Sequence, residues 1–109
     1  MPVPAFNLYP DFNVIRVSHT ELVVTDLAAS RAFYVDTLGL QVSAEDSEMI
    51  CLRAMEERGH HCLILRKGND PCCSYLAFRV YSEDDVDKAA AHFSGKGMAT
   101  EWVDRPFQG

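Results

Sequence analysis

One structural unit begins twice in this chain, and its second copy is shorter than its first. Residues 19–26 have the pattern of a strand that ends in a helix-capping residue, Asp26. Residues 75–82 repeat this pattern, with Ser82 in the capping position. Three strand-like segments follow the first helical stretch, and only one follows the second before Gly109. The pattern therefore predicts a repeated strand-and-helix unit, which can build a concave sheet around a metal or small ligand.

The first copy, residues 14–68, reads as a βαβββ module. Its opening segment, 14–24, is rich in β-branched side chains and predicts a strand. Gly39 stands where a helix commonly ends. Apolar residues recur at helical spacing before it, at Leu27, Tyr34 and Leu38. Three further strands are predicted at 40–44, 49–53 and 61–66.

The second copy, residues 69–109, starts in the loop signal Gly-Asn-Asp-Pro and reads as an incomplete βαβ(ββ) module. Residues 74–81 predict a strand, and Ser82 with Asp85 approximates a capping box. The helix is expected to end at Gly97, and the segment 98–103 to form a last strand. The apolar face of the expected helix comprises Val86, Ala89, Ala90 and Phe93. A proline-rich extended arm, 1–13, precedes both copies, and the whole forms one α+β domain.

Composition excludes several function classes. The formal charge of −6 and the lack of a Lys/Arg cluster argue against binding to nucleic acid or to an anionic membrane. No run of 18 apolar residues predicts a membrane span, and the N-terminus lacks the pattern of a secretory signal. The cysteines form no Cys-x-x-Cys pair, so we expect free thiols in the reducing cytoplasm, at Cys51, Cys62, Cys72 and Cys73.

Alternation along the first strand places His19 and Glu21 on one face. His61 belongs to a segment that can form a neighbouring strand. These three residues could form an improvised metal site, or line a polar surface through hydrogen bonds and water. His60 and His92 have no partner at ligand spacing and are expected at the surface.

The chain resembles the vicinal oxygen chelate superfamily, which includes glyoxalase I, bleomycin resistance proteins and type I extradiol dioxygenases. It is most similar to the N-terminal domain of the extradiol enzymes, in the branch of homoprotocatechuate (3,4-dihydroxyphenylacetate) 2,3-dioxygenase and catechol 2,3-dioxygenase. The resemblance rests on Val23-Val24-Thr25-Asp26-Leu27, the segment 30–40 with Phe33-Tyr34 and Leu38-Gly39, Leu52-Arg53, Glu56-Glu57, the segment 60–66 and Phe78-Arg79-Val80. It implies a glyoxalase/dioxygenase-like mixed sheet with helices on its outer face.

The resemblance also implies a role: the chain is the N-terminal, non-catalytic portion of an enzyme that opens catecholic rings with O₂ in aromatic catabolism. Fe(II), or Mn(II), would be bound by a C-terminal domain outside this sequence. His19 matches one ligand position of catalytic modules, but Tyr75 replaces the second histidine, and the carboxylate position falls near Leu63. No complete catalytic or metal site is therefore expected, and His19, Glu21 and His61 are vestigial candidates at most.

The alternative is a stand-alone small-molecule binding or resistance-type protein of the same superfamily, completed by dimerisation. In either case we expect a homo-oligomer. The second module stops early, so its sheet should have an open edge and its helix an incompletely covered apolar face.

Overall fold

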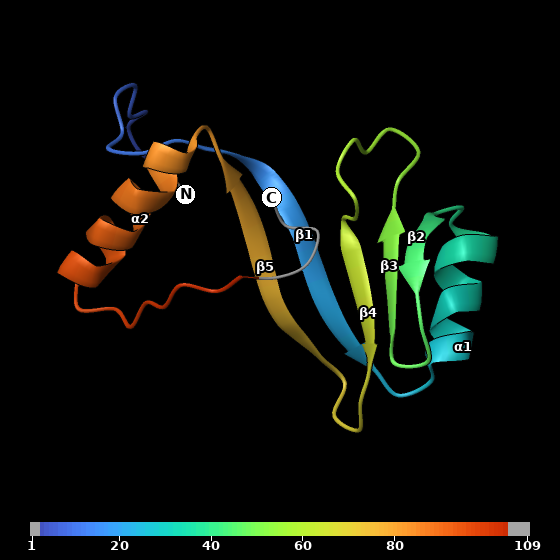
Figure 1. Ribbon diagram of the computed structural model, residues 1–109. Helices are drawn as coiled ribbons and strands as arrows, with labels where there is room; N and C mark the ends of the chain where they lie inside the picture. Colours follow the sequence, from blue (N-terminus) through green and yellow to red (C-terminus); the bar gives the residue numbers. More distant parts are fainter. Residues whose placement is uncertain (1–2, 105–109) are drawn as a thin grey trace. The chain divides into compact units, whose positions relative to one another are not determined.

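The chain forms a five-stranded mixed sheet with two α-helices, as shown by a computed structural model that describes residues 3–104 (Figure 1). The strands lie in the order β2-β3-β4-β1-β5, with β1 parallel to β4 and β3 antiparallel to both β2 and β4. The predicted α+β class is confirmed. The elements are β1 (Val14–Val24), α1 (Leu27–Arg31), η1 (Ala32–Thr37), β2 (Gln41–Glu45), β3 (Met49–Arg53), β4 (Leu63–Lys67), β5 (Cys72–Val80) and α2 (Glu83–Gly95).

Contacts divide the chain into two compact units. Val17–Phe78 forms the larger one, and the segment 3–16 with Arg79–Val103 forms the smaller one. The division into an arm and two modules, at 13/14 and 68/69, follows the repeat in the sequence and stays a prediction. The predicted arm begins with residues 1–2 and the predicted second module ends with residues 105–109, and both of these stretches lie outside the described part of the chain. Within residues 3–104, neither helix is long and apolar enough to cross a membrane.

The core of the larger unit lies between the sheet and the α1–η1 segment. Four buried side chains from β3 and β4 form its centre: Ile50, Leu52, Leu63 and Leu65. Partly buried side chains pack against them from β1, α1, η1, β2 and the segments between these elements: Leu22, Val24, Leu27, Tyr34, Val35, Leu40, Val42 and Cys62. Removing such side chains from water is the main favourable term in folding. Around β3 and β4, one face of the sheet is therefore apolar and covered by α1 and η1.

Local signals in the sequence explain how α1 begins and where the helical segment ends. The Asp26 carboxylate accepts a hydrogen bond from the Ala29 N–H at 3.0 Å, as an N-cap residue should. The helix continues as one π-helical stretch, η1, and Gly39 follows with φ of +80°, a conformation that glycine adopts without steric cost. The chain is thereby turned back along the sheet into β2.

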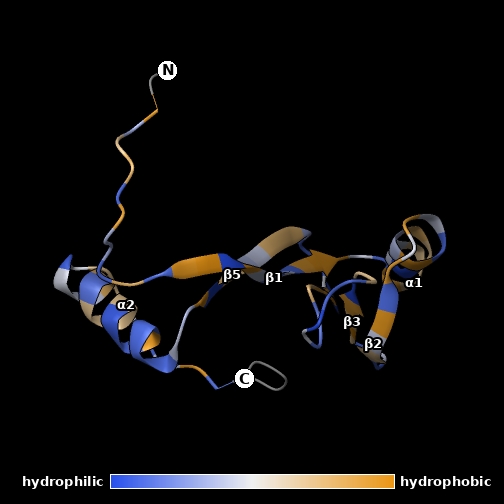
Figure 2. Ribbon diagram, turned by 90° about the horizontal axis from the view of Figure 1, so that it is seen from above, coloured by the Kyte–Doolittle hydropathy of each residue, from blue (hydrophilic) through white to orange (hydrophobic). Residues whose placement is uncertain are grey.

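The smaller unit contains α2, whose predicted capping box is present. The Asp85 carboxylate accepts hydrogen bonds from the Ser82 N–H and hydroxyl, at 3.1 and 3.2 Å. Gly97, with φ of +80°, follows the helix end. Phe12 meets the rings of His92 and Phe93 edge-on. Even so, Val86 and Phe93 stay exposed, and α2 is coloured mainly hydrophilic in Figure 2.

The prediction of a last strand at 98–103 is wrong. These residues form neither helix nor strand, and Met98, Trp102 and Val103 are exposed. Strand propensity reflects packing against neighbouring strands more than an intrinsic backbone preference, and none of the pairings in the sheet includes this segment. In the described residues, the second module therefore contributes only β5 and α2.

Candidate functional site

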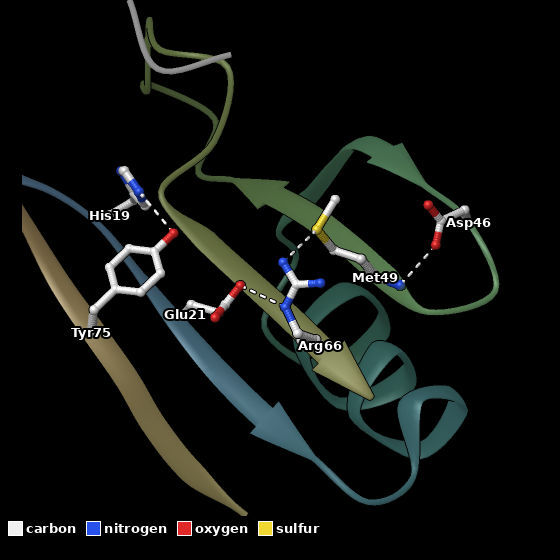
Figure 3. Close-up of polar contacts among 6 residues, drawn as sticks. All are labelled: His19, Glu21, Asp46, Met49, Arg66 and Tyr75. Atoms are coloured by element: carbon white, nitrogen blue, oxygen red, sulfur yellow. Dashed lines mark hydrogen bonds and ion pairs between the residues drawn. The ribbon is translucent and has the colours of Figure 1, made fainter. Parts of the chain in front are cut away.

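The sheet face opposite α1 carries a group of polar and titratable side chains. Pairing places Glu21 of β1 and Cys51 of β3 beside Ile64 of β4, and Met49 beside Arg66. These residues alternate with those that face the apolar core, so they point to the other side. Figure 3 shows His19 and Glu21 of β1, Met49 of β3, Arg66 of β4 and Tyr75 of β5 on this face, with α1 behind the sheet. We call it the polar face.

His19 is buried on the polar face between two hydroxyl groups. Its Nδ1 lies 3.0 Å from the Ser18 Oγ, and its Nε2 lies 3.3 Å from the Tyr75 hydroxyl (Figure 3). A neutral imidazole donates through one nitrogen and accepts through the other, so both contacts can form at once. A metal bound at His19 would have to displace one of them.

Glu21 is also buried, and its charge is paired. Arg66 Nε donates to Glu21 Oε1 at 2.8 Å, while the other end of the guanidinium lies 3.5 Å from the Met49 sulfur (Figure 3). A buried carboxylate needs such a partner because an isolated charge is costly to remove from water. The ion pair therefore accounts for Glu21 without a metal.

His61 lies two residues before β4 and brings a second imidazole to His19. The two ring centroids are 4.7 Å apart at an angle of 74°. His61 Nδ1 lies 3.0 Å from His60 Nδ1. Its Nε2 is buried and makes no hydrogen bond to any residue that the structure describes. Buried polar atoms are rarely left in this state, so this nitrogen requires an explanation.

The loop 54–62 between β3 and β4 places the two neighbouring histidines. Its residues bond to one another, as the Glu57 N–H donates to the Ala54 carbonyl at 3.1 Å. The loop returns to the sheet where the Cys62 N–H donates to the Leu52 carbonyl at 2.8 Å. This return brings His60 and His61 beside Cys51: one potential donor atom of each lies within 4.8 Å of the other two.

The charge state of this group follows from its burial. Burial lowers the pKa of His61 below its usual value, and the neighbouring His19 and His60 lower it further. Burial likewise raises the pKa of the Cys51 thiol. Both shifts favour the uncharged forms, so at neutral pH His61 is an uncharged imidazole and Cys51 is a protonated thiol.

The structure brings together only part of the site considered from the sequence. His19 and His61 meet, whereas Glu21 is turned to Arg66. His60, expected at the surface, is half-buried against His61. His92 lies elsewhere, in the smaller unit, 3.9 Å from Asp11.

Two histidines and one carboxylate on one face of the metal form the triad that holds non-haem iron. Here the carboxylate is bonded to an arginine, and both nitrogens of His19 are bonded to hydroxyls. The residues present do not fit that group. Sequence reasoning missed Cys51 and His60 because they belong to no spacing motif, and only the hairpin return of β3 and β4 joins them.

A groove of about 540 Å³ lies near the start of α1, but its charged groups already have structural roles. Asp26 caps α1, Asp46 accepts from the backbone of the β2–β3 turn, and Glu45 binds Arg31. Lys67 is the remaining charged residue of its lining. The polar face is therefore the better candidate site.

Comparison with known families agrees with this fold. The family model of the Glyoxalase/Bleomycin resistance protein/Dioxygenase superfamily matches residues 16–105. The chain belongs to this superfamily, and the predicted resemblance is confirmed.

The similar proteins are extradiol dioxygenases. The chain is 49% identical to the solved homoprotocatechuate 2,3-dioxygenase of Brevibacterium fuscum, with a TM-score of 0.77 over 84% of this chain and 28% of that one. It is 29% identical to the manganese-dependent 2,3-dihydroxybiphenyl 1,2-dioxygenase of Geobacillus genomosp. 3, over 84% of this chain and 29% of that protein. A metapyrocatechase of Geobacillus stearothermophilus is 25% identical over 87% of this chain and 29% of its own length. The chain thus spans less than a third of these relatives.

Proposed function

We propose that this chain is the N-terminal, non-catalytic portion of an extradiol dioxygenase, an oxidoreductase that opens catecholic rings with O₂. It serves as scaffold, and the metal of the whole enzyme, Fe(II) or Mn(II), is bound by residues outside the chain. The proposal rests on the observation that the fold matches homoprotocatechuate 2,3-dioxygenase at 49% identity, while among the described residues no two histidines converge with a carboxylate as an iron triad requires.

The hydrogen bonds of the polar face support a scaffold role. His19, which matches one ligand position, is held by hydroxyl groups, and the carboxylate of Glu21 on the same face is held by Arg66. Such contacts stabilise the sheet and leave no open coordination face for a catechol and O₂. The isolated chain should therefore neither bind Fe(II) or Mn(II) tightly nor cleave catechols.

A chimera tests the role of the chain. Residues 16–104 would replace the corresponding segment of the Brevibacterium fuscum homoprotocatechuate 2,3-dioxygenase, and the chimera would be assayed with 3,4-dihydroxyphenylacetate by the absorbance of the ring-opened product. We expect turnover by the chimera and none by the 109-residue chain supplied with Fe(II) or Mn(II). A folded chimera without activity, or ring cleavage by the chain alone, would contradict the proposal.

His19 provides the matched control for metal binding. In the chimera, His19→Ala should leave the iron or manganese content and the turnover unchanged, because His19 is bonded to Ser18 and Tyr75. Metal analysis of both proteins checks this. Loss of bound iron or manganese in His19→Ala, and again in His61→Ala, would show that this face does supply ligands.

We further propose that the protein acts in the cytoplasm and forms a homo-oligomer. All four cysteines are free thiols, a state that a reducing compartment maintains. Cell fractionation tests the location: recovery in a secreted fraction would contradict it.

A further inference from the structure

A second kind of metal chemistry is available on the polar face. Cys51, buried on β3, offers a sulfur, while His60 and His61 at the end of the loop 54–62 offer imidazole nitrogens. One potential donor atom from each lies within 4.8 Å of the other two. This combination contains no carboxylate, so its chemistry differs from that of an iron or manganese triad.

The buried nitrogen of His61 points independently to a ligand. Its residue is only 6% exposed, and its Nε2 has no hydrogen-bond partner among residues 3–104. Burying a polar atom without a partner is costly. Coordination of His61 by a cation would give this ring a partner that the described residues do not supply.

We propose that Cys51, His60 and His61 bind a zinc-class divalent cation, with water in the fourth position. Thiolate and imidazole donors favour Zn²⁺ over Mn²⁺ or Mg²⁺, which prefer oxygen ligands. Bonds of about 2.3 Å to sulfur and about 2.1 Å to nitrogen, set tetrahedrally, separate the ligand atoms by about 3.4–3.6 Å. Closing the present group to that size needs movements of about 1 Å, which a loop end can make. Binding removes the thiol proton of Cys51, and that proton passes to solvent.

The site belongs to this chain alone and does not depend on the proposed function. The reduced, chelator-treated 109-residue chain would be titrated without oxygen with Co²⁺, which reports tetrahedral geometry and thiolate ligation by its absorption bands. We expect one equivalent of Co²⁺ with a sulfur-to-metal charge-transfer band, displaced by one equivalent of Zn²⁺ but not by equimolar Mn²⁺. Saturation without that band, or displacement by Mn²⁺, would overturn the proposal.

Variants identify the ligands. Cys51→Ser should abolish the charge-transfer band, and His61→Gln should weaken binding by about 100-fold or more, since even indirect partners of metals contribute 10–100-fold. His60→Gln, at a half-buried loop position that tolerates the change, should weaken it similarly even if Cys51→Ser fails to fold.

The exposed neighbours Cys72 and Cys73 provide the matched control, because two adjacent thiols could bind a soft metal by themselves. The double variant Cys72→Ser/Cys73→Ser should keep the band and the affinity. A band that disappears in this double variant but persists in Cys51→Ser would show that the metal binds at Cys72 and Cys73 on β5, and would refute the site at Cys51, His60 and His61.

Discussion

Gly68, directly after β4, lies close to the side chain of Val23 in β1. A Cβ atom at this position would lie 2.5 Å from the Val23 Cγ1, and the Gly68 N–H donates to the Val24 carbonyl at 3.0 Å. Valine is stiff about χ1, so it cannot easily move aside. Gly68→Ala should therefore lower the free energy of unfolding by about 1–3 kcal/mol, the usual cost of overpacking. Urea denaturation measures this change.

Gly95→Ala is the matched control for that substitution. Gly95 is the last residue of α2, and a Cβ atom there would meet nothing within 4 Å. Alanine loses less backbone entropy than glycine in a helix, so this variant should be neutral or gain up to about 1 kcal/mol. Equal losses in both variants would mean that the contact with Val23 does not govern the position of Gly68.

At the scale of elements, a salt bridge joins Arg31 at the end of α1 to Glu45 at the end of β2. Its Nε and Nη2 donate to the two carboxylate oxygens of Glu45, at 2.9 and 3.2 Å. The hydrogen bond from Arg31 is the main reason that the pKa of Glu45 is lowered from its ordinary value near 4.5. The pair links the helix to the sheet edge, although both side chains are partly exposed.

The sign of the pH dependence follows from that shift. A carboxylate with a lowered folded-state pKa contributes stability that is present above its unfolded pKa and lost as the pH falls through the folded value. Glu45→Gln should therefore lower the melting temperature slightly at pH 7, and this difference should shrink and vanish as the pH falls below 4.5 and through the lowered pKa of Glu45. Thermal melts across this range, with Glu48→Gln as the control for removing an exposed charge, would detect it. A difference that grows on acidification would contradict the assignment.

The start of α2 depends on one carboxylate. Asp85 is buried and accepts from both the N–H and the hydroxyl of Ser82, whereas Asp84 in the same turn is exposed. Asp85→Ala should destabilise α2 by about 1 kcal/mol, the usual effect of losing a cap. Asp84→Ala removes an equal charge from the helix N-terminus and should cost less. Circular dichroism during thermal unfolding compares the stability of the two variants. Equal losses would mean that Asp85 contributes only its negative charge and not its hydrogen bonds to Ser82.

Elements with local signals could be predicted from the sequence, and features that need distant partners could not. Alternation placed His19 and Glu21 on one face, and Asp26 and Gly39 marked where the first helical segment begins and ends. The cluster of Cys51 with His60 escaped prediction because it depends on how a loop returns to the sheet. The segment 98–103 has residues typical of a strand, but a strand forms only when a neighbouring strand pairs with it. None of the five strands of the sheet pairs with this segment.

For the molecule as a whole, the described fold leaves apolar surface without cover. β5 is an edge strand, and its residues alternate so that Tyr75 reaches the polar face. Leu76 and Phe78 lie on the opposite face and are 51% and 55% exposed. In the smaller unit, Tyr81 and Trp102 are exposed as well. Unpaired edge groups beside exposed apolar side chains favour association with another chain.

We therefore predict that the chain self-associates, most simply as a two-fold dimer in which β5 pairs with β5 of a second copy. Antiparallel pairing satisfies the edge N–H and C=O groups of both copies and buries Phe78. Full burial of a phenylalanine contributes about 1.5–3 kcal/mol, so Phe78→Lys should raise the dissociation constant by about tenfold or more. Phe33→Lys, at a 50% exposed position on η1, should leave it unchanged. Sedimentation at micromolar concentration measures all three proteins, and a cooperative 12.2 kDa monomer of the unaltered chain would refute the prediction.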